Sequence, residues 1–227
     1  MNDNITEINK DSFWKLVQSA KETCGQDMDA MMDFLKDRLV SMGPEQAQNF
    51  HDILHAYEDL ADKFGLWDAG VMKEYGCSDD GFIDFRAWLI AQGRDLYLSA
   101  LADPDSLAEV IPYGDCCFET LSYVGDHAYE QLTGKSAYDQ TDWARYETLL
   151  AELEQDIVYK GGIEFPREGP ELKQYLPRLC AAHPDWDGKT RWNVQQKEMR
   201  DLIRAGKAYD QRQAPKKKHR SHGGEAR

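Results

Sequence analysis

Residues 76–82, GCSDDGF, place a thiol, a hydroxyl and two adjacent carboxylates directly before a glycine. This order is typical of the middle of a calcium-binding loop, with Gly81 at the sixth loop position. In that register the first ligand position falls on Gly76 and the bidentate twelfth position on Ala87, and neither has a side-chain oxygen. The stretch therefore lacks both ends of a calcium loop, and we expect no calcium site here.

The two carboxylates of this stretch permit two other interpretations. Like charges held close together separate in pKa, so Asp79 and Asp80 could divide the roles of general acid and general base. Alternatively, Ser78, Asp79 or Asp80 accepts backbone N–H bonds at the start of the following helix. We favour capping, because adjacent residues at a helix start need not point at one reacting atom. One cap uses one side chain, which leaves carboxylates for other contacts.

Two arginines and two further aspartates follow in the next part of the chain. Arg86 and Arg94 flank a strongly apolar segment, and Asp103 and Asp105 come after a short connection. We expect these four residues to form one polar cluster with the hydroxyl and carboxylates of GCSDDGF. The structural interpretation is a buried arginine–aspartate network that holds a helix junction together. The functional interpretation is a polar pocket for a cationic or polar ligand.

A second motif, HDILH at residues 51–55, has the spacing of a zinc-binding helix with Asp in place of Glu. One turn apart on a helix, His51 and His55 could share a metal ion. At about 100° per residue, however, both point about 120° away from the apolar stripe of that helix. The same side carries Glu58 and Asp62. We therefore expect a solvated polar face, and we predict no metal and no cofactor.

The elements that must position these groups are helices. Apolar residues recur every three or four positions, and no segment shows the two-residue alternation of a half-buried strand. A first helix should begin after a cap at Asp11 or Ser12 and end at Gly25. Further helices are expected over about residues 27–41, 44–63, 66–75, 82–92, 94–102, 119–132, 142–158, 172–182 and 193–213.

The run from Phe82 to Gln92 is apolar on nearly every side, which is typical of the buried centre of a helical bundle. Four tryptophans fall in apolar patterns and are expected in the core: Trp14, Trp67, Trp88 and Trp143. The sequence thus predicts an all-α protein with a single multi-helix, bundle-like domain. We expect a flexible N-terminus over 1–10, the domain over 11–183, a helical extension over 184–213 and a disordered basic tail over 214–227.

Charge is unevenly distributed along the 227 residues. Residues 197–227 carry 10 Lys and Arg against 4 Asp and Glu, a net charge of +6, whereas residues 1–196 carry 17 against 37, a net charge of −20. An acidic body disfavours binding to nucleic acid or to an anionic membrane. No apolar run approaches the roughly 18 residues of a transmembrane helix, and the N-terminus lacks the pattern of a secretory signal. We therefore expect a cytoplasmic protein that makes no membrane contact.

Several motifs together resemble one bacterial family of domains of unknown function, numbered forty-two forty. They are LWDAG at 66–70, GCSDDGF at 76–82, FRAWLIAQGR at 85–94 and ALADPDSL at 100–107. The resemblance covers roughly residues 11 to 180. It implies an all-helical cytoplasmic domain, but it supplies no activity and no catalytic residue. The chain departs from the family pattern at Asp68, where a small residue is usual, and in the basic end beyond about residue 185.

Three function hypotheses follow from these observations. The leading hypothesis is a non-enzymatic protein-interaction or regulatory module with an acidic surface, whose protein partner is itself basic. The second is a hydrolase or ligand-binding protein that uses the carboxylates of the polar cluster together with Arg86, with or without a metal. The third is a nucleic-acid-associated accessory protein that acts through Lys216, Lys217 and Lys218 of the tail.

Overall fold

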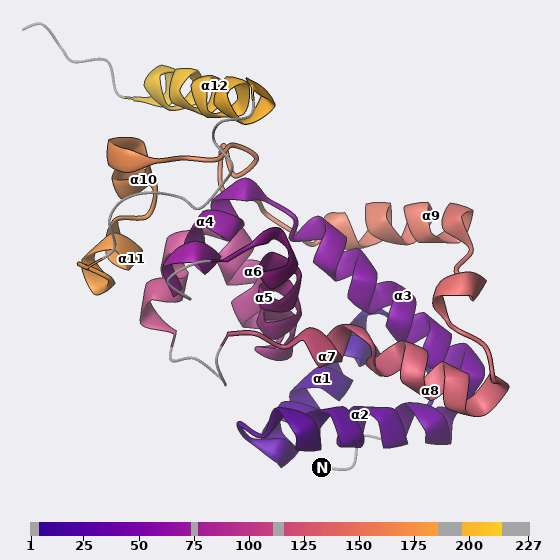
Figure 1. The fold of residues 1–227 in the computed structure, drawn as a ribbon. Coiled ribbons are helices and arrows are strands. Elements are labelled where there is room, and N and C mark those ends of the chain that lie inside the picture. The colour runs from indigo at the N-terminus through magenta and orange to yellow at the C-terminus, as the bar shows by residue number, and fades with distance from the viewer. Residues whose placement is uncertain (1–4, 74–76, 111–115, 186–196, 215–227) are drawn as a thin grey trace, which may run out of the picture.

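The structure is a computed structural model that describes residues 5–73, 77–110, 116–185 and 197–214. Every regular element in these ranges is a helix, which confirms the predicted all-α fold (Figure 1). The first helices are α1 (Lys10–Cys24), α2 (Met28–Met42), α3 (Pro44–Leu60), α4 (Phe64–Lys73), α5 (Asp79–Ala91) and α6 (Arg94–Ala102). They are followed by α7 (Glu119–Ser122), α8 (Val124–Thr133), α9 (Trp143–Glu154), α10 (Gly169–Tyr175), α11 (Pro177–Ala182) and α12 (Lys197–Gln213). Two short 3₁₀ helices, η1 (Pro104–Glu109) and η2 (Tyr138–Gln140), lie between them.

The ends of the first helices follow from capping chemistry. The cap of α1 is Asn9, so the expected cap at Asp11 or Ser12 is wrong. Asn9 Oδ1 accepts from the backbone N–H groups of Asp11 and Ser12, and Ser12 Oγ accepts from the N–H of Asn9, which completes a capping box. Gly43, at φ +95°, ends α2 and leads directly into Pro44 at the start of α3.

Helix α5 lies at the centre of the core, as its apolar sequence predicts. Phe85, Trp88 and Leu89 are fully buried, and Phe82 stacks on Trp67 of α4 with ring centroids 4.9 Å apart. Ile83 is the exception and is exposed to solvent. The core position expected for Trp143 is also wrong: this side chain, in the first turn of α9, is 68% exposed. Because α5 is apolar on nearly every side, other elements pack all around it.

The longer expected helices are interrupted. The segment expected as one helix over 119–132 consists of α7 and α8, and the segment expected over 172–182 consists of α10 and α11, with a break before Pro177. Proline explains the second break, because it disfavours helical backbone in the residue before it. Of the expected extension over 184–213, residues 197–213 form α12.

Figure 1 shows α12 beside α10 and the loop that precedes it, at the opposite end of the molecule from α2 and α8. The tail residues Lys216, Lys217 and Lys218 lie outside the described residues. Within those residues no helix is both long and apolar enough to cross a membrane.

Candidate functional site

The GCSDDGF stretch forms the cap of the central helix. Ser78 has extended backbone, and its Oγ accepts a 3.0 Å hydrogen bond from the N–H of Gly81. Asp79 and Asp80 occupy the first turn of α5 with exposed side chains, where their charge complements the helix dipole. Neither carboxylate pairs with an arginine of the described chain, contrary to expectation. This corner therefore acts as a helix start.

The two arginines expected beside these acids have other partners. Arg86 is buried: its Nη1 donates to the carbonyl of Glu58 at 2.9 Å, and its Nε donates to the carbonyl of Phe82 at 3.3 Å. A carboxylate also approaches it, because Asp62 Oδ1 lies 3.8 Å from Arg86 Nη1. Arg94 pairs with Asp156 at 3.3 Å, far from the GCSDDGF corner in sequence. The single polar cluster predicted from the sequence is thus divided among separate places in the fold.

Asp103 and Asp105 form a third, separate group around Arg178. Arg178 Nη2 lies 2.5 Å from Asp103 Oδ2, and its Nε lies 3.1 Å from Asp105 Oδ2. Asp105 also accepts the backbone N–H groups of Arg178 and Leu179 at 3.0 and 2.9 Å. Lys160 adds a second cation, 2.8 Å from Asp103. These carboxylates fasten the start of α11 to η1 and leave none of their charge unpaired for catalysis.

The histidines of HDILH lie in a buried polar cluster, so the predicted solvated face is wrong. His51 is 2% exposed, and Glu58 is buried beside it. His55 Nδ1 lies 2.7 Å from Glu58 Oε2, and the hydroxyl of Ser122 donates to Glu58 Oε1 at 2.5 Å. The ring of Tyr138 contacts both imidazoles, with centroids 4.4 and 5.2 Å away. We call these five residues the histidine cluster.

Helix α8 covers the histidine cluster because Gly125 has no side chain. A Cβ at Gly125 would lie 2.8 Å from Cα and Cβ of His51, so only glycine lets the two helices approach this closely. The segment that carries Tyr138 is fastened to α8 by Asp126, whose Oδ1 accepts from Ser136 Oγ at 2.8 Å and from the N–H of Ala137 at 2.6 Å. The residues that cover His51 and His55, Gly125 and Tyr138, thus lie at least seventy positions further along the chain.

Burial shifts the ionisation of this cluster. The pKa of His51 falls to about 3, first because burial disfavours the charged ring and then because of the neighbouring His55, against an opposing effect of Asp126. Burial also raises the pKa of Tyr138 to about 12, assisted by the charges of Glu58 and Asp126. His51 is therefore neutral at neutral pH. No three or more His, Cys, Asp or Glu side chains in the described ranges come together as metal ligands.

A further polar site, which no sequence motif predicts, lies where the loop before α10 contacts α12. Arg167 Nη1 donates to the carbonyls of Gly162 and Phe165, both at 3.0 Å. Its Nε and Nη2 each lie 2.9 Å from a carboxylate oxygen of Asp210 on α12, which makes a bidentate pair. The guanidinium lies over the ring of Tyr175, 3.6 Å from its centroid.

Glycines shape the floor of this site. A Cβ at Gly161 would meet the hydroxyl of Tyr209 at 2.7 Å, and one at Gly162 would meet its ring at 2.9 Å. On α12 itself, Gly206 faces Phe165, where a Cβ would come within 2.8 Å. We call this surface, formed by Gly161, Gly162, Phe165, Arg167 and Tyr175, the Arg167 socket. Its loop is held to the body by Asp68, which accepts the N–H of Arg167 at 3.1 Å.

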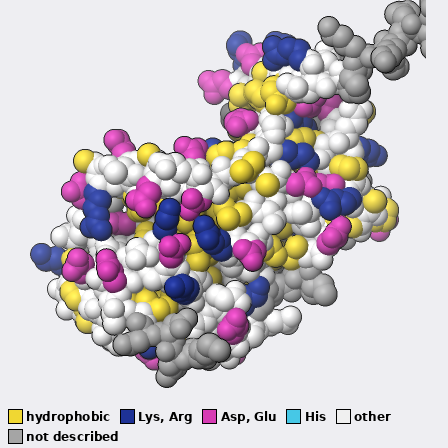
Figure 2. Space-filling view, turned by 180° about the vertical axis from the view of Figure 1, so that it is seen from behind, with side chains coloured by type: hydrophobic (Ala, Val, Ile, Leu, Met, Phe, Trp, Pro, Cys, Tyr) yellow, Lys and Arg dark blue, Asp and Glu magenta, His cyan; other side chains and the backbone are white. Residues whose placement is uncertain are grey.

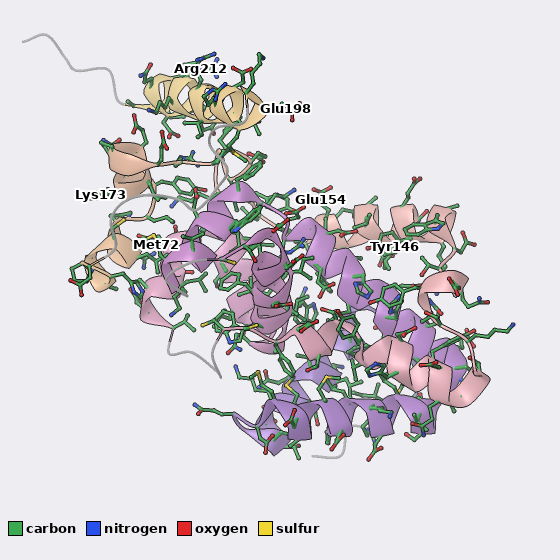
Figure 3. All side chains as sticks on the ribbon, in the orientation of Figure 1. Met72, Tyr146, Glu154, Lys173, Glu198 and Arg212 are labelled. Atoms are coloured by element: carbon green, nitrogen blue, oxygen red, sulfur yellow. The ribbon has the colours of Figure 1, made fainter. Side chains whose placement is uncertain are left out.

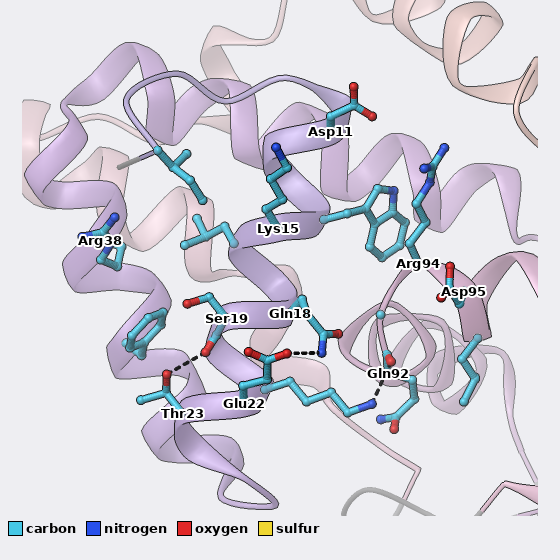
Figure 4. Close-up of a pocket in the computed structure, with 17 residues that line it drawn as sticks. Asp11, Lys15, Gln18, Ser19, Glu22, Thr23, Arg38, Gln92, Arg94 and Asp95 are labelled. Carbon is cyan, nitrogen blue, oxygen red and sulfur yellow. Dashed lines mark hydrogen bonds between the residues drawn. The ribbon is translucent and has the colours of Figure 1, made fainter. Parts of the chain in front are cut away.

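An open groove of 1390 Å³ runs along both sides of α1. Figure 4 shows Arg38 on one side of this helix and Gln92, Arg94 and Asp95 on the other. Two of its polar groups are already engaged, because Lys21 Nζ donates to the carbonyl of Gln92 at 2.8 Å and Glu22 accepts from Gln18. The groove therefore carries mixed charge and no convergent set of reactive groups.

Surface charge is interspersed on the face that Figure 2 shows. Acidic and basic side chains alternate over the body there, with apolar side chains between them. Figure 3 shows that α12, which carries the labelled Glu198 and Arg212, also projects side chains of both charges. Net charge alone therefore does not mark a binding face on this side of the molecule.

The fold places this chain among all-helical domains, and a family model defines it further. The chain belongs to the family described as protein of unknown function (DUF4240), whose model matches residues 8–131. This confirms the family that the motifs resemble, although the match ends well before residue 180. It includes four of the five residues of the histidine cluster, whereas Tyr138 and the whole Arg167 socket lie beyond it. No curated protein and no solved structure matches the chain significantly.

Proposed function

We propose that the protein is a non-enzymatic protein-interaction module that recognises an amphipathic helix through the Arg167 socket. The observation that carries this proposal is the pairing of Arg167 with Asp210. The Arg167 side chain is 1% exposed, yet the outer edge of its guanidinium is completed by a carboxylate from a separate helix. A buried cation without its partner is strongly unfavourable, so a helix bound in the socket must supply a carboxylate to Arg167.

The residues of α12 define what such a ligand looks like. Tyr209 fills the space left by two glycines, Asp210 pairs with Arg167, and Gly206 permits close contact with Phe165. Lys207 adds an ion pair with Glu171 at 3.5 Å. We infer that a partner helix presents the pattern Gly-x-x-Tyr-Asp, with basic residues around it. A basic helix also suits the net charge of −20 on residues 1–196.

The contact with α12 is narrow, which supports an exchangeable ligand. Ile203 and Gly206 are the buried residues of this 17-residue helix. Most of its stability on the body must therefore come from a few contacts around Arg167. A partner helix that makes the same contacts can compete with α12, although the covalent connection of α12 raises its effective concentration.

The contacts of the proposed residues give the alternative of a hydrolase less support. It required the carboxylates of the predicted cluster to act together with Arg86, and Asp103 and Asp105 pair instead with Arg178. The hydroxyl of Ser122 donates to Glu58 and not to a histidine, so it is not activated as a nucleophile. The nucleic-acid hypothesis depends on tail residues 216–218, and no observation on the described residues favours it.

A labelled peptide of residues 197–213 tests the proposal. We expect this peptide to bind the full-length Asp210→Asn variant more tightly than wild type. In the variant, α12 has lost its ion pair with Arg167 and competes less well for the Arg167 socket. The matched control lies within the peptide. Asp201 pairs with Lys197 and Arg204 of the same helix, so a D201N peptide should bind like the parent, whereas a D210N peptide should lose at least about 1.4 kcal/mol, or tenfold. Equal binding of the two variant peptides would refute the Arg167 socket as the recognition site.

A further inference from the structure

The buried polar atoms without partners gather on one face of α3. Three of the five such side-chain atoms among the described residues are Gln48 Oε1, His51 Nδ1 and His55 Nε2. Their positions, three and four residues apart, place them along the same side of the helix. Buried polar atoms are nearly always paired with protein, with ordered water or with an ion. The three unpaired atoms on this face of α3 therefore indicate a small bound partner, such as an ion or ordered water.

Glu58 fixes the orientation of one imidazole. Its carboxylate accepts a hydrogen bond from His55 Nδ1 at 2.7 Å and also accepts one from the hydroxyl of Ser122. In the neutral ring this leaves the lone pair on Nε2, which is the buried atom without a partner. A carboxylate that holds the far nitrogen of a histidine is the usual support of a metal-bound imidazole.

The second imidazole has complementary properties. The ring of His51 lies edge-on to the ring of His55, with centroids 4.4 Å apart. Its Nδ1 is buried and has no hydrogen-bond partner, so a second imidazole nitrogen without a partner lies on the same face of the helix. Two histidines one turn apart on a helix can bind the same ion.

We propose that His51 and His55 form a binding site for one divalent transition-metal ion that prefers imidazole nitrogen, such as Zn²⁺ or Ni²⁺. His51 and His55 supply two ligands, Gln48 lies on the same face of the helix, and water completes the coordination. Glu58 is a positioning residue that acts through His55. The oxygen-seeking ions Ca²⁺ and Mg²⁺ are excluded by the nitrogen donors.

Tyr138 controls access to these two nitrogens. Its ring covers both imidazoles while remaining 44% exposed, and η2, which carries it, is only three residues long. A rotation of the Tyr138 side chain would expose the two nitrogens to solvent while α3 and α8 stay in place. Because Glu58 holds the ring of His55, it is the ring of His51 that needs to turn toward His55 Nε2 for the two to share the ion.

Titration of metal-free full-length protein with Zn²⁺, followed by calorimetry, tests the site. We expect one Zn²⁺ per chain in wild type and loss of that site in His51→Gln and in His55→Gln. His127→Gln is the matched control, because His127 lies on α8 with an exposed side chain and should leave binding unchanged. Circular dichroism establishes that each variant is folded, and Mg²⁺ in place of Zn²⁺ should give no binding.

Glu58→Gln distinguishes a positioning role from a purely structural one. It should weaken Zn²⁺ binding by roughly 10–100-fold while the Co²⁺-substituted protein keeps the absorption spectrum of the wild-type site. Two results would overturn the proposal. One is the absence of Zn²⁺ uptake by wild type, which leaves ordered water as the partner of the unpaired nitrogens. The other is uptake that survives in folded His51→Gln and His55→Gln, which places the ion on other groups.

Discussion

Gly125 of α8 lies directly against the backbone of His51 on α3, where an added Cβ would come 2.8 Å from the His51 Cα. The two helices therefore meet backbone to backbone at the buried histidine. This contact, and not the sequence of α3 alone, converts the polar side of that helix into an interior surface. It also places Ser122, just before α8, within reach of Glu58.

Gly125→Ala should therefore destabilise the protein, although alanine is the better helix former. Helix propensity favours alanine by about 1 kcal/mol, but separating α8 from α3 should cost about 1–3 kcal/mol more than this gain. Gly81→Ala is the control, since its Cβ would meet only Ser78 Oγ at 3.4 Å and Cys77 Sγ at 3.6 Å, ordinary contact distances. Urea unfolding of both variants should show a lower midpoint for Gly125→Ala alone. A similar shift in both would contradict the close contact.

Ser78→Ala should destabilise the protein by about 1 kcal/mol, because it removes the side chain that caps α5. Asp80→Ala should have a smaller effect, since this exposed carboxylate contributes only through the helix dipole. The two effects differ in their response to salt. In chemical unfolding at 0.05 and 1 M NaCl, the effect of Asp80→Ala should shrink and that of Ser78→Ala should persist. If Asp80→Ala destabilises the protein more than Ser78→Ala at both salt concentrations, Ser78 is not the residue that caps α5.

Hydrophobic periodicity was sufficient to predict the all-α fold and the central position of α5. It failed where burial depends on a second neighbour. The apolar stripe of α3 correctly predicts the face toward the core, but the opposite face, with His51 and Glu58, is covered by α8 and η2. The converse holds for Trp143, which matches the apolar pattern of α9 but lies in its first turn, where no described element covers it and 68% of it stays exposed.

The candidate site was harder to predict than the fold, because its charge pairs are distant in sequence. Proximity along the chain suggested that Arg86 and Arg94 meet the nearby aspartates. The actual partner of Asp103 and Asp105 is Arg178, more than seventy residues away, and Arg167 meets Asp210 from a helix outside the family match. Local spacing identifies caps such as Ser78, but only the packing of the whole chain decides which opposite charges meet.

Asp105 and Asp103 should differ sharply when replaced, although both pair with Arg178. Asp105 is 3% exposed and accepts the N–H groups of Arg178 and Leu179, so Asp105→Ala leaves two backbone donors at the start of α11 without an acceptor. Each such donor costs about 1–3 kcal/mol when buried. Asp103 is partly exposed, and Asp103→Ala should cost at most about 1 kcal/mol. Thermal unfolding measures both. Equal losses would show that the ion pair, and not the backbone contact, stabilises this junction.

Acid should destabilise the protein through His51 before the carboxylates titrate. In the unfolded chain this ring binds a proton below its ordinary pKa of 6.5, whereas in the folded chain it stays neutral down to about pH 3. The unfolded state thus binds more protons in this window, and stability falls with falling pH by at most about 1.4 kcal/mol per pH unit. Asp52 and Asp84 act in the opposite direction, because burial raises their pKa values and their protonation favours the folded state.

Urea unfolding between pH 7.5 and 5.5 isolates the contribution of His51. His51→Gln should lose less stability over this interval than wild type, whatever its stability at pH 7.5. His127→Gln, at an exposed position on α8, is the matched control for replacing a histidine with glutamine. His183, whose pKa burial also lowers, contributes in the same direction in all three proteins and cancels in the comparison. A His51→Gln variant with the wild-type pH dependence would mean that this ring is already protonated in the folded protein near pH 6.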